Sequence, residues 1–232
     1  MLTDGQIERY SRQIILPQLG GRGQEKLLSA AIAVAGTGDM SISVALYLAA
    51  AGVGTLGVDA PAAAAIAGLN PDCRTQSLPA ALDADRAAAA ARNYDLLLAA
   101  DLAPDACSAL NVACMAVRKQ LVWGAATGHA GRVAVFTGHR PAEPCYACQP
   151  LPLPPARGQA DDAAVLASVT AAFIGTLLAT ETIKLAAGIE TPLTKRLLVY
   201  DALDATVRAL DLHKDPHCAA CGGVNRAEAV CG

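Results

Sequence analysis

One stretch near the start of the chain constrains the fold more than any other. Residues 31–35 form an apolar run that is too short for a helix before Gly36 and Gly38 interrupt it. The next segment, residues 42–51, is rich in alanine and leucine and ends at Gly52. Strand, glycine turn and helix in this order begin a doubly wound sheet, and such a turn lets backbone N–H groups approach a pyrophosphate. The sequence therefore predicts a nucleotide-type turn.

Two residues in this turn depart from the usual glycine pattern. Ser41 takes the third glycine position and is small enough for close packing of helix on strand. Asp39 places a carboxylate where the helix N-terminus would hold phosphate. Two unit charges about 4 Å apart repel by about 4 kcal/mol at the effective dielectric of a protein surface. We predict that Gly36, Gly38 and Ser41 form the cofactor loop and that Asp39 opposes phosphate binding there.

Strand and helix patterns alternate through the first half of the chain, which favours a parallel sheet. Later strands alternate apolar and polar residues, as antiparallel strands do. We therefore expect an α/β fold, a Rossmann-like doubly wound mixed sheet with a parallel N-terminal half and antiparallel C-terminal strands. After the first strand, the predicted strands cover residues 55–58, 73–78, 94–100, 121–126, 132–136, 196–200 and 206–210. Further predicted helices follow Thr3 and cover residues 24–28, 66–70, 83–92 and 106–118.

The length and composition fit one domain. A chain of 232 residues with 53% hydrophobic content can bury a single sizeable core. We expect one domain over residues 1–232, divided into an N-terminal arm (1–28), a Rossmann-like nucleotide-binding half (29–126) and a C-terminal half (127–232). The prolines of residues 149–155 predict an extended crossover loop.

Charge and hydropathy exclude several kinds of partner. The net charge of −3 and the aromatic content of 3% give neither a basic surface nor a stacking platform, so we expect no nucleic acid partner. The uncharged residues 163–180 approach membrane length but run directly into Glu181, and a fully buried helix explains them. Charges such as Asp4 and Arg9 exclude a signal peptide. We expect no membrane partner and a cytoplasmic location.

Two C-x-x-C pairs predict a metal centre. Each pair can present two thiolates to one tetrahedral ion, and two pairs complete a Cys₄ set of the kind that structural zinc prefers. A closed shell of four sulfurs leaves no position for substrate, so the zinc would be architectural. A redox C-x-x-C or a disulfide are the alternatives, although both are less common in the cytosol. The predicted ligands are Cys145, Cys148, Cys218 and Cys221.

The other cysteines have a plainer interpretation. Cys73, Cys107 and Cys114 occur singly in the sequence, and we expect them to be small buried apolar residues. Cys231 lies one residue from the end, and we expect a free thiol there.

Several motifs together resemble one family. Besides the cysteine pairs, they lie at residues 9–16, 23–27, 47–54, 123–126, 131–136, 144–148, 174–177 and 181–185. In these motifs the chain resembles the ThiF/MoeB/HesA family, bacterial relatives of the ubiquitin-activating enzymes, over most of its length except residues 60–93. The resemblance implies ATP and Mg²⁺ as cofactors, adenylation of the C-terminal glycine of a small ubiquitin-like sulfur carrier, and a homodimer with a structural Cys₄ zinc.

The resemblance also implies roles for three residues. Arg12 matches an arginine that reaches the nucleotide of the partner subunit, and Asp59 matches the acidic residue that holds the ribose. The family's carboxylate for Mg²⁺ and catalysis falls on Leu102, and Asp101 is one position away. We therefore assign Arg12 and Asp101 as catalytic candidates and Asp59 as a cofactor ligand.

One family segment has no counterpart in this sequence. After the ribose acid, the family has an Asn-x-x-Arg-Gln motif and then a lysine, whose cations face the phosphates. Residues 60–69 contain no charged side chain. We therefore predict a catalytically impaired, zinc-bearing homodimer that acts by binding a partner, since losing one such contact costs orders of magnitude in rate.

Two other interpretations stay open from the sequence. An active adenylyltransferase would need a rearranged site built from Arg12, Asp59 and Asp101, with Arg74 recruited as a further cation. A nicotinamide or flavin oxidoreductase rests on the glycine turn alone, and that motif is weak by itself.

Overall fold

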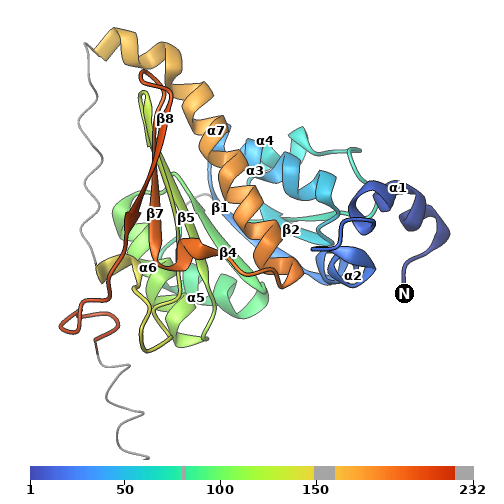
Figure 1. The fold of residues 1–232 in the computed structure, drawn as a ribbon, viewed down its shortest axis with the longest axis horizontal. Helices are drawn as coiled ribbons and strands as arrows, with labels where there is room; N and C mark the ends of the chain where they lie inside the picture. The colour runs from blue at the N-terminus through green and yellow to red at the C-terminus, as the bar shows by residue number, and fades with distance from the viewer. Residues whose placement is uncertain (80–81, 149–159, 223–232) are drawn as a thin grey trace, which may run out of the picture.

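A single eight-stranded mixed sheet forms the centre of the molecule (Figure 1). The computed structural model describes residues 1–79, 82–148 and 160–222, with side chains from residue 166 onward in the last helix. The predicted crossover at 149–155 and Cys231 lie outside the described residues. In spatial order the strands are β3 (Arg74–Ser77), β2 (Thr55–Val58), β1 (Ala31–Gly36), β4 (Leu96–Ala100), β5 (Leu121–Thr127), β6 (Ala130–Phe136), β7 (Arg196–Asp201) and β8 (Thr206–Asp211).

The pairing confirms the predicted fold class. β3, β2, β1, β4 and β5 are parallel, and β6, β7 and β8 continue the sheet as antiparallel strands. Every strand predicted from the sequence is present, with bounds that differ by at most two residues. The buried β4 is apolar throughout, as a strand covered on both faces must be.

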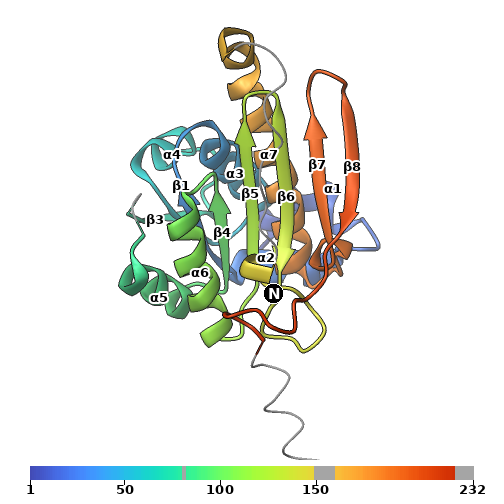
Figure 2. The ribbon, with the colours of Figure 1, turned by 90° about the vertical axis from the view of Figure 1, so that its left-hand side faces the viewer.

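Helices cover both faces of the sheet. The helices are α1 (Asp4–Ile14), α2 (Gly20–Ser29), α3 (Gly38–Ala51), α4 (Ala60–Ala65), α5 (Ala84–Asn93), α6 (Pro104–Ala116) and α7 (Ala160–Ala187). α3, α4 and α7 enclose one apolar core, whereas α5 and α6 enclose a second core on the opposite face. Figure 2 shows α5 and α6 in front of the sheet, with no helix of the described chain in front of β7 and β8.

Two predicted helices begin at other residues than we expected. α2 begins at Gly20 and not at residue 24, and the Gly23 N–H donates to the Leu19 carbonyl (3.0 Å) in its first turn. The short helix after β2 is α4 and not residues 66–70, because Asp59 caps it and Pro61 starts its first turn.

We expected the long helix α7 to be fully buried, and this prediction is wrong. The helix covers the sheet with one face only. Its Ile174 and Leu178 reach Gly131 and Gly124 on the sheet, whereas Val169 is 66% exposed. The stretch Leu166–Ala187 is long and apolar enough to cross a membrane, and 39% of its apolar window is buried. The core helix of a soluble protein meets the same criterion, so one such helix is weak evidence for a membrane span.

A hydrogen-bonded cluster holds α1 against the sheet. Buried Asn70 donates from Nδ2 to the Tyr10 hydroxyl (2.8 Å) and to the Ala49 carbonyl (2.7 Å). Tyr10 in turn donates to Asp72, which also accepts from Arg9 at 2.9 Å. The predicted cap of α1 is confirmed, since Thr3 and Gln6 form a capping box. The N-terminal arm is therefore fixed to the loop before β3.

This cluster predicts a pH-dependent contribution to stability. Although burial opposes it, hydrogen bonds from Gln6 and Tyr10 and the charge of Arg9 lower the pKa of Asp72 below 3.8. Stability from such a carboxylate is present above the unfolded pKa of about 3.9 and is lost as the pH falls through the folded pKa. We expect Asp72→Asn to lower the free energy of unfolding by about 1–2 kcal/mol at about pH 7. Urea denaturation should show this difference shrinking in acid.

The exposed Asp85 on α5 provides the control. Asp85→Asn should leave the urea midpoint within about 0.5 kcal/mol of the wild type at both pH values. A difference for Asp72→Asn that is independent of pH would contradict the ionic role of this group.

Candidate functional site

Three predicted site residues meet at the carboxyl edge of the parallel strands. Gly36 ends β1, Asp59 follows β2, and Asp101 follows β4. β2 and β4 are the two neighbours of β1, and the strand order reverses beside β1. Ligands of open α/β sheets bind at this switch point, outside the carboxyl ends of the strands. The structure therefore brings these residues together where the fold predicts a ligand.

The two glycines of the turn are required for different structural reasons. Gly36 has a φ of 148°, and a Cβ placed on it would lie 2.0 Å from the Ala100 carbonyl oxygen of β4. Gly38 has a φ of 78° and has open space where its Cβ would be. The Ser41 hydroxyl donates to the Gly38 carbonyl (3.0 Å), which secures the first turn of α3. The close approach of the neighbouring strands β1 and β4 is therefore enough to explain a glycine at position 36, and no bound nucleotide is needed to explain it.

Asp39 occupies the first turn of α3 and is exposed to solvent. The residue before the helix, Thr37, makes no side-chain cap bond. The charge of Asp39 therefore interacts with the helix N-terminus, where a phosphate would otherwise lie.

The two aspartates already have backbone partners. Asp59 is buried, and its Oδ1 accepts from the Ala62 N–H (3.1 Å) as the cap of α4. Asp101 is exposed, adopts a left-handed φ of 58°, and accepts from the Ala126 N–H at 3.2 Å. Residues other than glycine are uncommon in the left-handed region of backbone conformation, and those that occur there are often found at functional sites. Asp101 is thus well placed, while part of the Asp59 carboxylate is engaged by the helix cap.

The predicted cations lie at the other edge of the sheet. Arg12 is on α1, which packs through Tyr10 on Gly52 and Asn70, in loops that precede β2 and β3. Arg74 begins β3 and pairs in register with Thr55, at the start of β2. A four-residue strand of about 13 Å therefore separates Arg74 from the edge that carries Asp59. The structure therefore does not bring Arg74 to Asp59 and Asp101 of the same chain, as a rearranged nucleotide site would need.

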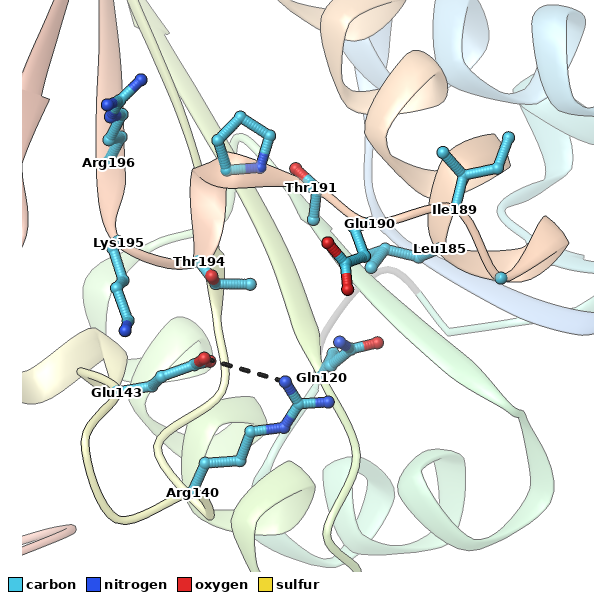
Figure 3. A pocket seen from close by; sticks show the side chains of 12 residues that line it. Gln120, Arg140, Glu143, Leu185, Ile189, Glu190, Thr191, Thr194, Lys195 and Arg196 are labelled. Carbon is cyan, nitrogen blue, oxygen red and sulfur yellow. Dashed lines mark ion pairs between the residues drawn. The ribbon is translucent and has the colours of Figure 1, made fainter. Parts of the chain in front are cut away.

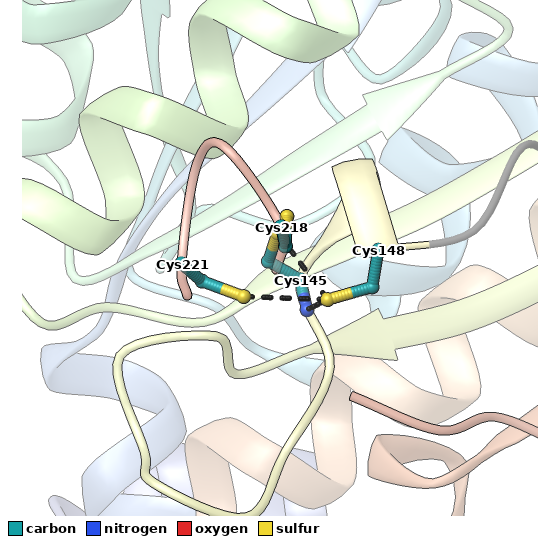
Figure 4. Close-up of side chains that lie close together, drawn as sticks. All are labelled: Cys145, Cys148, Cys218 and Cys221. Atoms are coloured by element: carbon teal, nitrogen blue, oxygen red, sulfur yellow. Dashed lines mark hydrogen bonds between the residues drawn. The ribbon is translucent and has the colours of Figure 1, made fainter. Parts of the chain in front are cut away.

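The four predicted metal ligands form one buried cluster (Figure 4). Their sulfurs lie within 4.8 Å of one another, with Cys145–Cys218 at 3.7 Å and Cys148–Cys221 at 3.3 Å. A tetrahedral zinc with ligands at about 2.3 Å holds sulfurs about 3.8 Å apart. The donor set and the spacing are therefore compatible with a zinc clip, and these residues can hold a metal ion.

The cluster joins distant parts of the chain and lies far from the glycine turn. The first pair follows β6, which runs away from the carboxyl edge, and the second pair follows β8. The Tyr146 N–H donates to Asn111 of α6 (3.0 Å), and Lys214 donates to the Arg140 carbonyl (3.0 Å). A metal here would tie the C-terminal segment to the sheet and would touch no substrate at the turn.

The single cysteines of the described chain have no sign of reactivity. Burial raises the pKa of Cys107 to about 11 and that of Cys114 to about 12. Half-buried Cys73 also has a pKa raised by burial, to about 11. Thiols with raised pKa values are poor nucleophiles at neutral pH.

A polar cavity of about 670 Å³ lies at the amino edge of the sheet (Figure 3). Its charged lining includes the ion pair of Arg140 with Glu143 (3.7 Å) together with Glu190 and Lys195. Sequence reasoning missed this cavity because loops from distant parts of the chain build it. It lies opposite the glycine turn, so it does not belong to the same site.

An apolar groove follows α3 and α7 on the molecular surface. One hollow of about 650 Å³ lies between these helices and begins at Asp39, and a second of about 420 Å³ continues to Gln13 in the last turn of α1. Tyr47, which is 54% exposed, lines both hollows. We call this surface the α3–α7 groove, and its lining also includes Leu16, Leu46, Val169, Phe173 and Ile183.

Comparison with known proteins identifies the family. The model of the ThiF family matches residues 10–59 and 60–220. The chain belongs to the ThiF family. The match comes in two segments that meet between Asp59 and Ala60.

Named relatives of this ThiF-family chain are adenylyltransferases. It is 36% identical to a sulfur carrier protein adenylyltransferase of Thermus thermophilus, and the alignment covers 95% of this chain and 92% of that protein. It is also 36% identical to the adenylyltransferase and sulfurtransferase MOCS3 of Bos taurus, of which it covers 54%. The chain thus spans about half the length of its MOCS3 relatives.

Solved structures support the fold. Escherichia coli MccB with MccA-N7isoAsn has a TM-score of 0.74 and 15% identity, and the match covers 93% of this chain and 74% of MccB. PaaA has a TM-score of 0.72 and 16% identity, over 92% of this chain and 76% of PaaA. Likeness at this level of identity concerns the fold alone.

Proposed function

We propose that this ThiF-family protein has lost adenylation and acts by binding, as a homodimer, a small partner of the ubiquitin-like sulfur carrier class. The observation that carries the proposal is the short connection after Asp59. Between Asp59 and Asn70 the chain has only α4 and a few uncharged residues. A triphosphate at this edge would therefore lack the cations that the family resemblance implies.

The alignment to relatives supports a missing segment at this point. The family match is divided directly after Asp59. The alignment to the Thermus thermophilus relative is 251 positions long, which exceeds the 232 residues of this chain. The relative therefore has residues that this chain lacks. We infer that the division after Asp59 marks part of them.

Electrostatics at the carboxyl edge support the same conclusion. Asp39 and Asp101 are both exposed there, whereas Arg12 and Arg74 lie toward the opposite edge of the same chain. Catalysis of adenylyl transfer depends on donors and cations that stabilise phosphate charge. Two exposed carboxylates at this edge, neither of which forms an ion pair with a described residue, disfavour that charge.

An active adenylyltransferase is the second candidate. It is favoured by the convergence of Gly36, Asp59 and Asp101 at the switch point and by the 36% identity to the Thermus thermophilus enzyme. In that case the cations would come from Arg12 of a second copy.

Carrier-dependent pyrophosphate exchange separates the two candidates. The assay combines the chain with ATP, Mg²⁺ and a ubiquitin-like sulfur carrier ending in glycine, with the Thermus thermophilus relative as positive control. We expect exchange at least about 10³-fold below the relative, since each lost phosphate contact costs about 10²–10³ in rate. Exchange within about tenfold of the relative would establish the second candidate.

We propose that the ion in the cysteine cluster is zinc and that its role is architectural. Four sulfurs at tetrahedral spacing, buried and without an open position, favour Zn²⁺ over metals that need water ligands. The proposal places the protein in the cytoplasm, where thiols remain reduced.

The α3–α7 groove is the proposed dimer surface, and a second copy is its occupant. The groove has Asp39 at one end and Gln13, next to Arg12, at the other. A twofold arrangement would therefore bring Arg12 of one chain toward Asp39 of its partner. Opposite charges at the two ends of one apolar surface favour this self-association.

A charge in the middle of the groove should prevent dimerisation. We expect the wild type to sediment as a dimer of 23.5 kDa chains and Tyr47→Glu to sediment as a monomer, because a carboxylate would be buried in the interface. Val112, 56% exposed on α6, provides a matched control, and Val112→Glu should remain dimeric. Analytical ultracentrifugation checks both variants, and a dimeric Tyr47→Glu would exclude this surface.

A further inference from the structure

Asn111 is a buried polar side chain in the middle of α6. It is 2% exposed, and its neighbours Leu110 and Cys114 belong to the apolar core between α6 and the sheet. A polar group in such a place costs free energy unless its donors and acceptors are satisfied. Leucine would serve packing alone equally well, so the polar contacts of this amide are what distinguish it.

One side of α6 faces the first cysteine pair. Asn111 and Met115 are one helical turn apart and lie on the same side of the helix, and Met115 packs against the cysteine cluster. The Asn111 Oδ1 accepts from the Tyr146 N–H at 3.0 Å. Tyr146 follows Cys145 directly, so the amide of Asn111 lies beside the first ligand of the cluster.

The donor half of this amide is free within the described chain. The buried Nδ2 has no hydrogen-bond partner among the described residues. Burial raises the pKa of the Cys145 thiol to about 11, and the Asn111 side chain is the strongest of the influences that lower it. The Nδ2 group therefore lies near the Cys145 sulfur and favours its negative charge.

Thiolates that bind a metal still accept hydrogen bonds from N–H groups. Such contacts outside the ligand shell orient the ligands and tune their charge. The Cys148 sulfur already accepts from the Cys145 N–H at 3.3 Å. A donor for the Cys145 sulfur is available in the Nδ2 group of Asn111, which no other acceptor of the described chain uses.

We propose that Asn111 is a positioning residue of the metal centre, which holds the Tyr146 backbone through Oδ1 and donates from Nδ2 to the Cys145 thiolate. A thiol that coordinates a metal is deprotonated, and a charged acceptor strengthens the N–H···S bond. This contact makes α6 a part of the metal centre. The proposal rests on the proposed metal ion in the cysteine cluster.

Two variants separate the two ends of the amide. Asn111→Asp keeps an oxygen for the Tyr146 N–H and loses the donor, whereas Asn111→Leu loses both. We expect each variant of the full chain to bind Zn²⁺ about 10–100-fold more weakly than the wild type in competition with a chelator. Asn93, exposed in the last turn of α5, provides the matched control, and Asn93→Asp should bind Zn²⁺ as the wild type does.

Co²⁺ in place of Zn²⁺ gives a readout that a purely structural role of Asn111 would not change. Loss of a hydrogen bond raises the energy of the electrons on the ligand sulfur. The sulfur-to-cobalt charge-transfer band should therefore lie at longer wavelength in both Asn111 variants than in the wild type. A band at the wild-type position in both variants would overturn the proposal.

A measurement on the wild type covers the case in which neither variant folds. In the full chain labelled with ¹⁵N-asparagine, the Asn111 Nδ2 protons are assigned by their proximity to the Tyr146 N–H. We expect one of them to change chemical shift when Cd²⁺ replaces Zn²⁺, since a proton bonded to a ligand sulfur senses the metal. The Nδ2 protons of Asn70, which bond to Tyr10 and Ala49, should not move. Unchanged Asn111 protons would contradict the bond to Cys145.

The outcomes distinguish this inference from the proposed metal. A wild-type chain that binds no metal ion would overturn both. If the wild type and both Asn111 variants bind Zn²⁺ equally, the metal proposal stands and the role of Asn111 fails. Pyrophosphate exchange tests the proposed loss of adenylation separately from either.

Discussion

Removing one ligand of the cysteine cluster should release the metal and destabilise the C-terminal half of the protein. Structural zinc contributes on the order of 10 kcal/mol to folding in small zinc-binding peptides. Here the ion would hold the segments after β6 and β8 together, and both pairs are buried. We expect Cys145→Ser to lower stability by about 4 kcal/mol or more, and Tm by about 10 °C or more. Thermal denaturation with elemental analysis checks this.

A cysteine outside the cluster supplies the control. Cys73→Ser should keep one zinc per chain, because Cys73 is not among the clustered thiols. Protein purified under reducing conditions that contains no zinc, yet melts as a fully folded chain, would contradict the metal assignment.

The two glycines of the turn should respond very differently to alanine. Gly36→Ala places a Cβ 2.0 Å from a backbone oxygen at a φ of 148°, and neither can move without separating β1 from β4. We expect a loss of at least about 3 kcal/mol. Gly38→Ala meets no atom and has only the cost of a left-handed φ, about 1 kcal/mol. Chemical denaturation of both variants gives these values.

The two variants also test why residue 36 is a glycine. If Gly36→Ala is as mild as Gly38→Ala, the close approach of β1 and β4 does not require a glycine at this position. Nucleotide binding would then be the better explanation of Gly36, which would count against the proposed loss of that binding.

The sequence predicted the elements that follow local rules. The apolar runs of β1, β4 and β5 depend on neighbouring residues alone, and all three strands are in place. The cysteine cluster was predictable because two C-x-x-C pairs specify a tetrahedral set wherever the chain brings them together.

The features that sequence reasoning missed depend on tertiary contacts. The half-exposed α7 is one example, because only the side of this helix that carries Ile174 and Leu178 faces the sheet. The edge occupied by Arg74 likewise follows from its pairing with Thr55.

Calorimetric titration of the full chain with Mg²⁺–ATP measures the loss of the nucleotide site directly. We expect no saturable heat at concentrations where the Thermus thermophilus relative, titrated in parallel, is saturated. Asp39→Gly should not restore binding, because residues 60–69 would still lack a cation. A saturating isotherm from the wild-type chain would contradict the loss of the nucleotide site.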